Sequence, residues 1–105
     1  MNIEFRKLIS NADAPMDLLL LADPSEELVT RYLKKGTCYL AVLDDETIGV
    51  ALIMETKPKT VEIMNIAIKE EFQNKGIGKQ LLQFVIAEIK QGDVDYIEIG
   101  TGNPG

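Results

Sequence analysis

The spacing of apolar residues divides the chain into eight elements. Alternation of apolar and polar residues is the period of a half-buried β-strand, and a spacing of three and four is that of an amphipathic helix. The pattern predicts strands over residues 2–9, 37–43, 47–56, 60–68 and 96–100 and helices over residues 16–21, 24–35 and 75–91. The order is therefore β-α-α-β-β-β-α-β, in a single domain that spans residues 1–105.

The stretch over residues 60–68 is apolar on both faces, which is typical of a central strand covered by helices on both sides of the sheet. The helix over residues 75–91 connects it to the last strand through a right-handed crossover, which makes those two strands parallel. The polar turn at residues 44–46 is short enough for an antiparallel hairpin. We therefore predict an α/β fold with a mixed sheet and helices on both faces.

Glycine, proline and short polar residues mark the helix ends. Asp23 is the candidate N-cap of the second helix, Pro24 occupies its first position and Gly36 ends it. Gly92 is the candidate C-cap of the third helix.

The corner between the strand over 60–68 and the following helix carries two glycines, Gly76 and Gly78. Without a Cβ, the backbone can come close to a bound group. The first N–H groups of a helix have no partner inside the helix and carry a partial positive charge, so they suit phosphate oxygens. Lys75 and Lys79 add full charges beside the glycines. The corner is therefore a candidate anion site.

Two common phosphate loops do not fit this corner. A nucleotide-hydrolase P-loop needs glycine at position 73 and serine or threonine after Lys79, whereas the chain has Gln73 and Gln80. A dinucleotide fingerprint that begins at Gly76 needs a third glycine at position 81, which is Leu81. The pattern that remains is Gln-x-x-Gly-x-Gly.

Composition excludes several function classes. The formal charge of −6 argues against nucleic acid as a partner, because phosphate backbones are bound by clustered lysine and arginine. The absence of histidine excludes imidazole bases and most zinc sites, so we predict no metal. The single cysteine, Cys38, permits no internal disulfide, and the chain has neither a signal peptide nor an apolar run of membrane length. The expected location is the cytoplasm.

Gln73, Gly76 and Gly78, placed between a strand and a helix, resemble the coenzyme A pyrophosphate loop of the GNAT superfamily of N-acetyltransferases. Glu62 is similar in spacing to the general base of the histone acetyltransferase branch, and Asn103 resembles an asparagine that meets the pantetheine arm. The similarity extends from about Ile3 to the end of the chain. The phrases at residues 20–25 and 58–60 resemble a small prokaryotic subgroup sometimes labelled indoleacetate acetyltransferase.

The resemblance implies an enzyme that moves the acetyl group of acetyl-CoA to a primary amine of a small molecule or peptide by direct attack. Glu62 would take the amine proton, and backbone groups where the two parallel strands splay apart would bond the pantetheine and polarise the thioester. The residues expected to contact the coenzyme are Ile66, Ala67, Ile68, Gln73, Asn74, Lys75, Gly76, Ile77, Gly78, Lys79 and Asn103.

A complete family member continues with a further helix and two strands, and that helix usually carries the tyrosine that protonates the departing thiolate. We expect that tyrosine to lie beyond Gly105 and the chain to be truncated at its C-terminal end. An apolar sheet edge at residues 96–100 would then favour a homodimer.

Simpler interpretations compete with these roles. Glu62 could equally be a solvent-facing carboxylate or pair with Lys59, and Asn65 is more simply a polar residue satisfied inside the sheet. Cys38 is expected in the core, and Asn103 could be a turn residue before a proline. The alternative function is a non-catalytic module that binds acyl-CoA or a partner chain.

Overall fold

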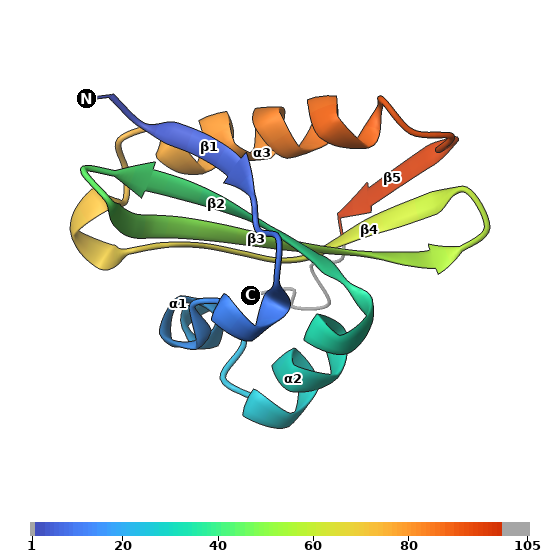
Figure 1. Cartoon of the computed structure of the whole chain (residues 1–105), viewed down its shortest axis with the longest axis horizontal. Coiled ribbons are helices and arrows are strands. Elements are labelled where there is room, and N and C mark those ends of the chain that lie inside the picture. The colour runs from blue at the N-terminus through green and yellow to red at the C-terminus, as the bar shows by residue number, and fades with distance from the viewer. Residues whose placement is uncertain (1, 100–105) are drawn as a thin grey trace.

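A five-stranded sheet forms the centre of the molecule (Figure 1). The computed structural model describes residues 2–99 of the chain. The strands follow the order β1-β2-β3-β4-β5, with antiparallel pairs from β1 to β4 and a parallel pair between β4 and β5. Their bounds are Glu4–Lys7 (β1), Thr37–Leu43 (β2), Glu46–Lys57 (β3), Thr60–Ile68 (β4) and Tyr96–Ile99 (β5). The predicted mixed sheet is confirmed.

Helices cover both faces of this sheet, as predicted. Helices α1 (Met16–Ala22) and α2 (Glu26–Lys35) lie on one face, and α3 (Ile77–Ile89) lies on the other (Figure 1). Two short 3₁₀ turns, Asn11–Asp13 and Glu70–Phe72, precede α1 and α3. The β-α-α-β-β-β-α-β order therefore holds for the described residues.

Alternation along β2 and β3 sends successive side chains into two separate cores. Cys38 and Leu40 pack with Leu19 under α1 and α2, whereas Tyr39 and Ala51 pack under α3. Cys38 is buried as expected, and Leu40, Val42, Val50 and Leu52 on the same face are buried with it, whereas Met54 at the end of that face is only half-buried. Both faces of β2 and β3 are thus needed to hold the three helices.

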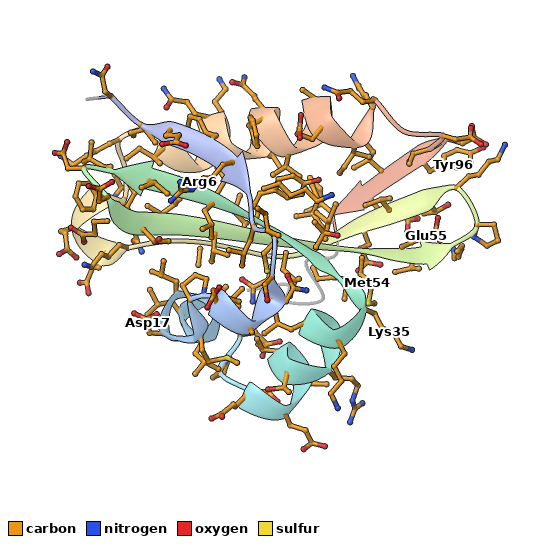
Figure 2. The ribbon with its side chains drawn as sticks, viewed as in Figure 1. Arg6, Asp17, Lys35, Met54, Glu55 and Tyr96 are labelled. Atoms are coloured by element: carbon orange, nitrogen blue, oxygen red, sulfur yellow. The ribbon has the colours of Figure 1, made fainter. Side chains whose placement is uncertain are left out.

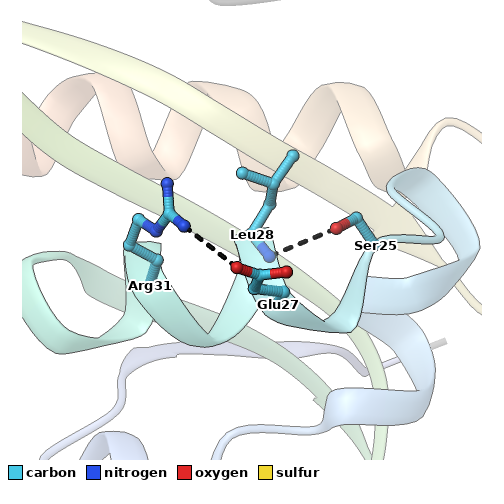
Figure 3. A network of polar contacts seen from close by, with 4 residues as sticks. All are labelled: Ser25, Glu27, Leu28 and Arg31. Atoms are coloured by element: carbon cyan, nitrogen blue, oxygen red, sulfur yellow. Dashed lines mark hydrogen bonds and ion pairs between the residues drawn. The ribbon is translucent and has the colours of Figure 1, made fainter.

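The start of α2 differs from the prediction. Ser25, and not Asp23, is the N-cap, because its Oγ accepts the N–H of Leu28 at 3.2 Å (Figure 3). Asp23 lies before the cap, and its Oδ1 accepts a hydrogen bond from the N–H of Ser25 at 3.0 Å. An exposed pair one turn apart, Glu27 with Arg31 at 3.2 Å, follows in the first turns and contributes little to stability (Figure 3).

The predicted first strand and the predicted third helix are both longer than the observed elements. The first strand ends at Lys7 rather than residue 9, and the side chain of Ile9 is fully exposed. Helix α3 begins at Ile77 because Gly76 has a left-handed φ of 80°, which cannot continue into a right-handed helix. The C-cap of α3 is Lys90, and Gly92 lies two residues beyond it. Gly36 does end α2, as predicted.

Burial of Cys38 has a measurable consequence. The thiol is fully buried, and this burial raises its pKa from 9.0 to about 11. Between pH 9 and 11 the unfolded chain therefore loses the thiol proton while the folded chain keeps it. We expect this group to lower the free energy of unfolding by roughly 1.4 kcal/mol per pH unit in that window.

Urea denaturation at pH 8 and pH 10.5 tests this expectation, with Cys38→Ala as the control. The variant loses packing at both pH values but has no thiol to titrate. The difference in stability between parent and variant should therefore narrow at the higher pH. A difference that does not change with pH would show that the thiol titrates normally in the fold.

Candidate functional site

The corner after β4 is built from two left-handed backbone positions. Asn74 has a φ of 62° and Gly76 a φ of 80°. Asparagine tolerates this region because its side chain is short and polar, and glycine enters it without steric cost. The two positions turn the chain from the 3₁₀ turn at Glu70–Phe72 into α3. The predicted glycine corner is thus a defined turn and not an irregular loop.

The first turn of α3 presents backbone N–H groups without a side-chain cap. The N-cap residue is Gly76, which has no side chain to accept a hydrogen bond from these N–H groups. The first intrahelical hydrogen bond runs from the N–H of Gln80 to the carbonyl oxygen of Gly76 at 3.1 Å. A Cβ placed on Gly76 would find no atom within 4 Å apart from its immediate neighbours along the chain, so the space in front of this turn is open. Lys75 and Lys79 are exposed beside it. This end of α3 can bind an anion.

Ile77 and Gly78 can meet a ligand only through their backbone. The side chain of Ile77 is 2% exposed and packs in the core with Ala41 and Ile48. A Cβ on Gly78 would lie 3.6 Å from a side-chain carbon of Ile68, an ordinary contact. The Ile77 side chain therefore anchors the first turn of α3 to the sheet.

A pocket of about 230 Å³ opens between the end of β4 and the last turn of α1. Gln73 joins this pocket to the corner, because its Nε2 donates to the carbonyl oxygen of Ile68 at 3.0 Å. The pocket is lined by Leu21, Ala22, Ile66, Ala67, Ile68 and Gln73. The last four of these residues are among those expected from the sequence to contact a coenzyme, whereas the two from α1 are not. Leu21 is 60% exposed although it ends an apolar run, and no local sequence pattern indicates that it would face β4.

The course of β4 changes in the middle of the strand. Ile53 of β3 pairs with Ile63, but its neighbour Leu52 pairs with Asn65, so Met64 is an extra residue in a β-bulge.

Strand β5 pairs with β4 from Thr60 to Ile63 and reaches the end of the described residues at Ile99. The expected splaying of the two strands beside Ile66–Ile68 lies outside the described residues of β5. Asn103 also lies outside the described residues.

Glu62 lies on the face of β4 that is turned away from α3. Its neighbours Val61 and Ile63 pack with α3, so Glu62 is on the side of α1 and α2 and is half-buried. Lys59 pairs instead with Asp93 at 3.4 Å. The structure thus contradicts the interpretation of Glu62 as a partner of Lys59. Glu62 also does not line the pocket at the end of β4.

Glu98 was not singled out by any sequence pattern, but in the structure it lies beside Glu62. The two residues are partners in the parallel register of β4 and β5, so their side chains leave the same face. Glu98 is exposed. Such a pairing depends on the register between two strands, and a local sequence pattern does not reveal it.

The three tyrosines of the described part of the chain do not line the pocket. Tyr96 is 68% exposed and lies at the opposite end of the molecule from Asp17 of α1 (Figure 2). Tyr39 is buried against Phe84, and burial, with a smaller contribution from the charge of Glu88, raises its pKa. Tyr32 packs against the core under α1 and α2.

Residues 2–99 contain no cluster of three or more acidic or cysteine side chains that could hold a metal ion. In the same part of the chain, no helix is both long and apolar enough to cross a membrane.

The chain belongs to the acetyltransferase (GNAT) family, whose sequence model matches residues 8–104. A curated relative, the uncharacterised N-acetyltransferase YvbK of Bacillus subtilis, is 54% identical over 91 residues, which are 87% of this chain and 59% of the relative. The chain therefore spans about three fifths of the length of that relative.

Solved structures of the same family have the same fold. A GNAT family acetyltransferase from Elizabethkingia anophelis, with acetyl-CoA bound, matches with a TM-score of 0.88 and 44% identity over 93% of this chain and 64% of that chain. An IAA acetyltransferase from Bacillus cereus matches with a TM-score of 0.89 and 40% identity over 93% of this chain and 65% of that chain.

Proposed function

We propose that this chain carries the coenzyme-binding part of an acetyl-CoA-dependent N-acetyltransferase. The observation that supports this proposal most strongly is that the candidate anion site at the start of α3 and the pocket at the end of β4 adjoin each other. The uncapped first turn of α3, with Gly76 and two exposed lysines, leads through Gln73 into the pocket at the end of β4. A relative of 44% identity has acetyl-CoA bound.

In this proposal the pyrophosphate of the coenzyme occupies the turn from Gln73 to Gly78. The N–H groups at the start of α3 donate to phosphate oxygens, and Lys75 and Lys79 balance part of the negative charge. The lysines matter because the chain as a whole has a formal charge of −6 and would otherwise repel an anionic ligand. The pantetheine arm then follows the backbone at Ile66–Ile68 into the pocket.

The proposed reaction is direct attack of an amine on the acetyl thioester. The amine nitrogen forms a bond with the carbonyl carbon, and the carbon–sulfur bond breaks to release the coenzyme thiolate. A backbone N–H at Ile66–Ile68 would stabilise the oxyanion, an effect worth roughly 2.7–4 kcal/mol per donor in other enzymes. Glu62 would take the amine proton, directly or through a water molecule, because an ammonium has no free electron pair for attack.

A non-catalytic acyl-CoA-binding module is the second candidate. Two observations favour it. Glu62 stands outside the pocket, and the tyrosines of residues 2–99 do not line it. A module of this kind would bind the thioester without breaking it.

We also infer a homodimer and a cytoplasmic location, each supported by one kind of observation. Tyr96 and Ile99 of β5 expose 68% and 58% of their surface, which suits contact with a second copy. A single cysteine that is buried and free suits a reducing compartment.

An assay of coenzyme thiol release distinguishes the two candidate functions. The chain is incubated with acetyl-CoA and a panel of small primary amines and lysine peptides, and free thiol is measured with a chromogenic reagent. Cys38 is buried, so it adds little background. The proposal predicts release that needs both the chain and an amine. Binding of acetyl-CoA without release, for every amine tested, would establish the module instead.

A further inference from the structure

Asn65 is one of two polar side chains, with Thr60, that are buried among residues 2–99, and it is 5% exposed. Its Nδ2 donates to the carbonyl oxygen of Leu19 at 3.1 Å, across 46 positions of sequence. Its Oδ1 has no hydrogen-bond partner in the described part of the chain. An unsatisfied buried group costs roughly 1–3 kcal/mol, so stability alone does not favour an amide at this position.

The partner of Asn65 lies in the last turn of α1. The carbonyl oxygen of Leu19 already accepts the N–H of Asp23 at 3.1 Å, the bond that ends the helix. Asn65 adds a second donor to the same oxygen and thereby ties this turn to β4. Helix α1 has only seven residues, a length that is not stable in isolation, so its position depends on such tertiary contacts.

The turn that Asn65 holds is also a wall of the pocket. Leu21 and Ala22 form the α1 side, and Ile66 forms the opposite side together with the two residues after it. Asn65 directly precedes Ile66 at the β-bulge. The side chain of Asn65 therefore links the α1 wall of the pocket to the β4 wall.

We propose that Asn65 is a positioning residue for the coenzyme pocket. By holding the last turn of α1 against β4, it sets the width of the slot that the pantetheine arm enters. This inference rests on the proposed function. It assigns to Asn65 no contact with the coenzyme itself, so the effect of its loss is transmitted through α1.

Calorimetric titration with coenzyme A tests the role with three variants. Asn65→Leu removes the amide at similar volume, and Asn65→Asp keeps the size but, when ionised, has no donor for Leu19. Thr60→Val is the matched control, because it removes the other buried polar group from the far end of the same strand. At pH 8 we expect both Asn65 variants to raise the dissociation constant about tenfold, or 1.4 kcal/mol. Thr60→Val should leave it within about twofold of the parent.

The pH dependence of the Asn65→Asp variant separates positioning from general destabilisation. A protonated carboxyl group regains an O–H that can donate to the carbonyl oxygen of Leu19, and burial favours the protonated form. The ratio of the dissociation constants of this variant and the parent should therefore fall toward one between pH 8 and pH 5. The same ratio for Asn65→Leu should stay constant.

Hydrogen exchange of backbone amides measures the α1 anchor without any ligand. The Asn65 variants should lose protection in α1, whereas α2 should exchange as in the parent. A parent that binds coenzyme A together with Asn65 variants that bind equally well would overturn this inference alone. Unchanged protection of α1 in the variants would overturn it as well. A folded parent that binds no coenzyme A would instead overturn the proposed function, and with it the role of Asn65 in binding.

Discussion

Replacement of Gly76 with proline is expected to weaken coenzyme A binding by at least 100-fold. Proline fixes φ near −65°, whereas this turn requires a φ of 80°. The change also removes one backbone N–H from the anion site. Because proline cannot adopt the left-handed φ, the neighbouring N–H groups of the turn also lose their positions. A charge-assisted hydrogen bond contributes roughly 1.5–3 kcal/mol, so the loss of two such bonds corresponds to about two powers of ten in affinity or more.

Gly78→Ala is the matched control for this prediction. Gly78 lies inside the helix, and an added Cβ there makes only an ordinary contact with Ile68. Alanine also favours the helix by up to about 1 kcal/mol. Alanine keeps the backbone N–H through which Gly78 would meet the pyrophosphate, so this variant should bind coenzyme A nearly as well as the parent. Circular dichroism should show that both variants retain α3. Comparable affinity of the folded Gly76→Pro variant and the parent would place the pyrophosphate elsewhere.

Glu62→Gln is expected to lower kcat by about 10²–10⁴-fold while the affinity for acetyl-CoA stays unchanged. Glutamine keeps the size of the side chain but cannot accept a proton. The loss should be greatest below the pKa of the acceptor amine, where nearly all of the amine is protonated and needs a base. Steady-state rates across a pH series, combined with calorimetry of the coenzyme, measure the two effects separately.

Glu98→Gln distinguishes a base from a simple negative charge. Glu98 is the register partner of Glu62 on β5, so this variant removes the same charge from the same face of the sheet. If Glu62 acts as the base, the loss for Glu98→Gln should be much smaller. Equal losses for the two variants would mean that the carboxylates only attract a cationic amine. An unchanged acetylation rate for Glu62→Gln would mean that Glu62 has no catalytic role and is only a solvated carboxylate.

The order and type of the elements could be predicted because their periodicity is strong. The alternation at residues 37–43 and 47–56 and the spacing of apolar residues in α3 left little ambiguity. Boundaries were less accurate, because neighbouring residues compete for one role. Asp23 and Ser25 can both cap a helix, and the choice between them depends on the local backbone path.

The chemistry of the corner could be read from Gly76 and the residues around it, because glycine spacing between a strand and a helix is a local signal. The α1 wall of the pocket, the pairing of Glu62 with Glu98 and the anchor from Asn65 to Leu19 were not predictable in this way. Each joins residues that are far apart in sequence, and only the packed fold brings them together. The coenzyme contacts themselves stay predictions.

The most direct test of the account is calorimetric titration of the chain with acetyl-CoA and, in parallel, with acetylpantetheine. Acetylpantetheine has the thioester arm but lacks the pyrophosphate that the turn from Gln73 to Gly78 is proposed to hold. We predict saturable binding of acetyl-CoA with one ligand per chain, weakened by added salt because charged contacts contribute. Acetylpantetheine should bind far more weakly. Equal affinity for the two ligands, or no binding of acetyl-CoA to the folded chain, would contradict the assignment of this corner as the coenzyme site.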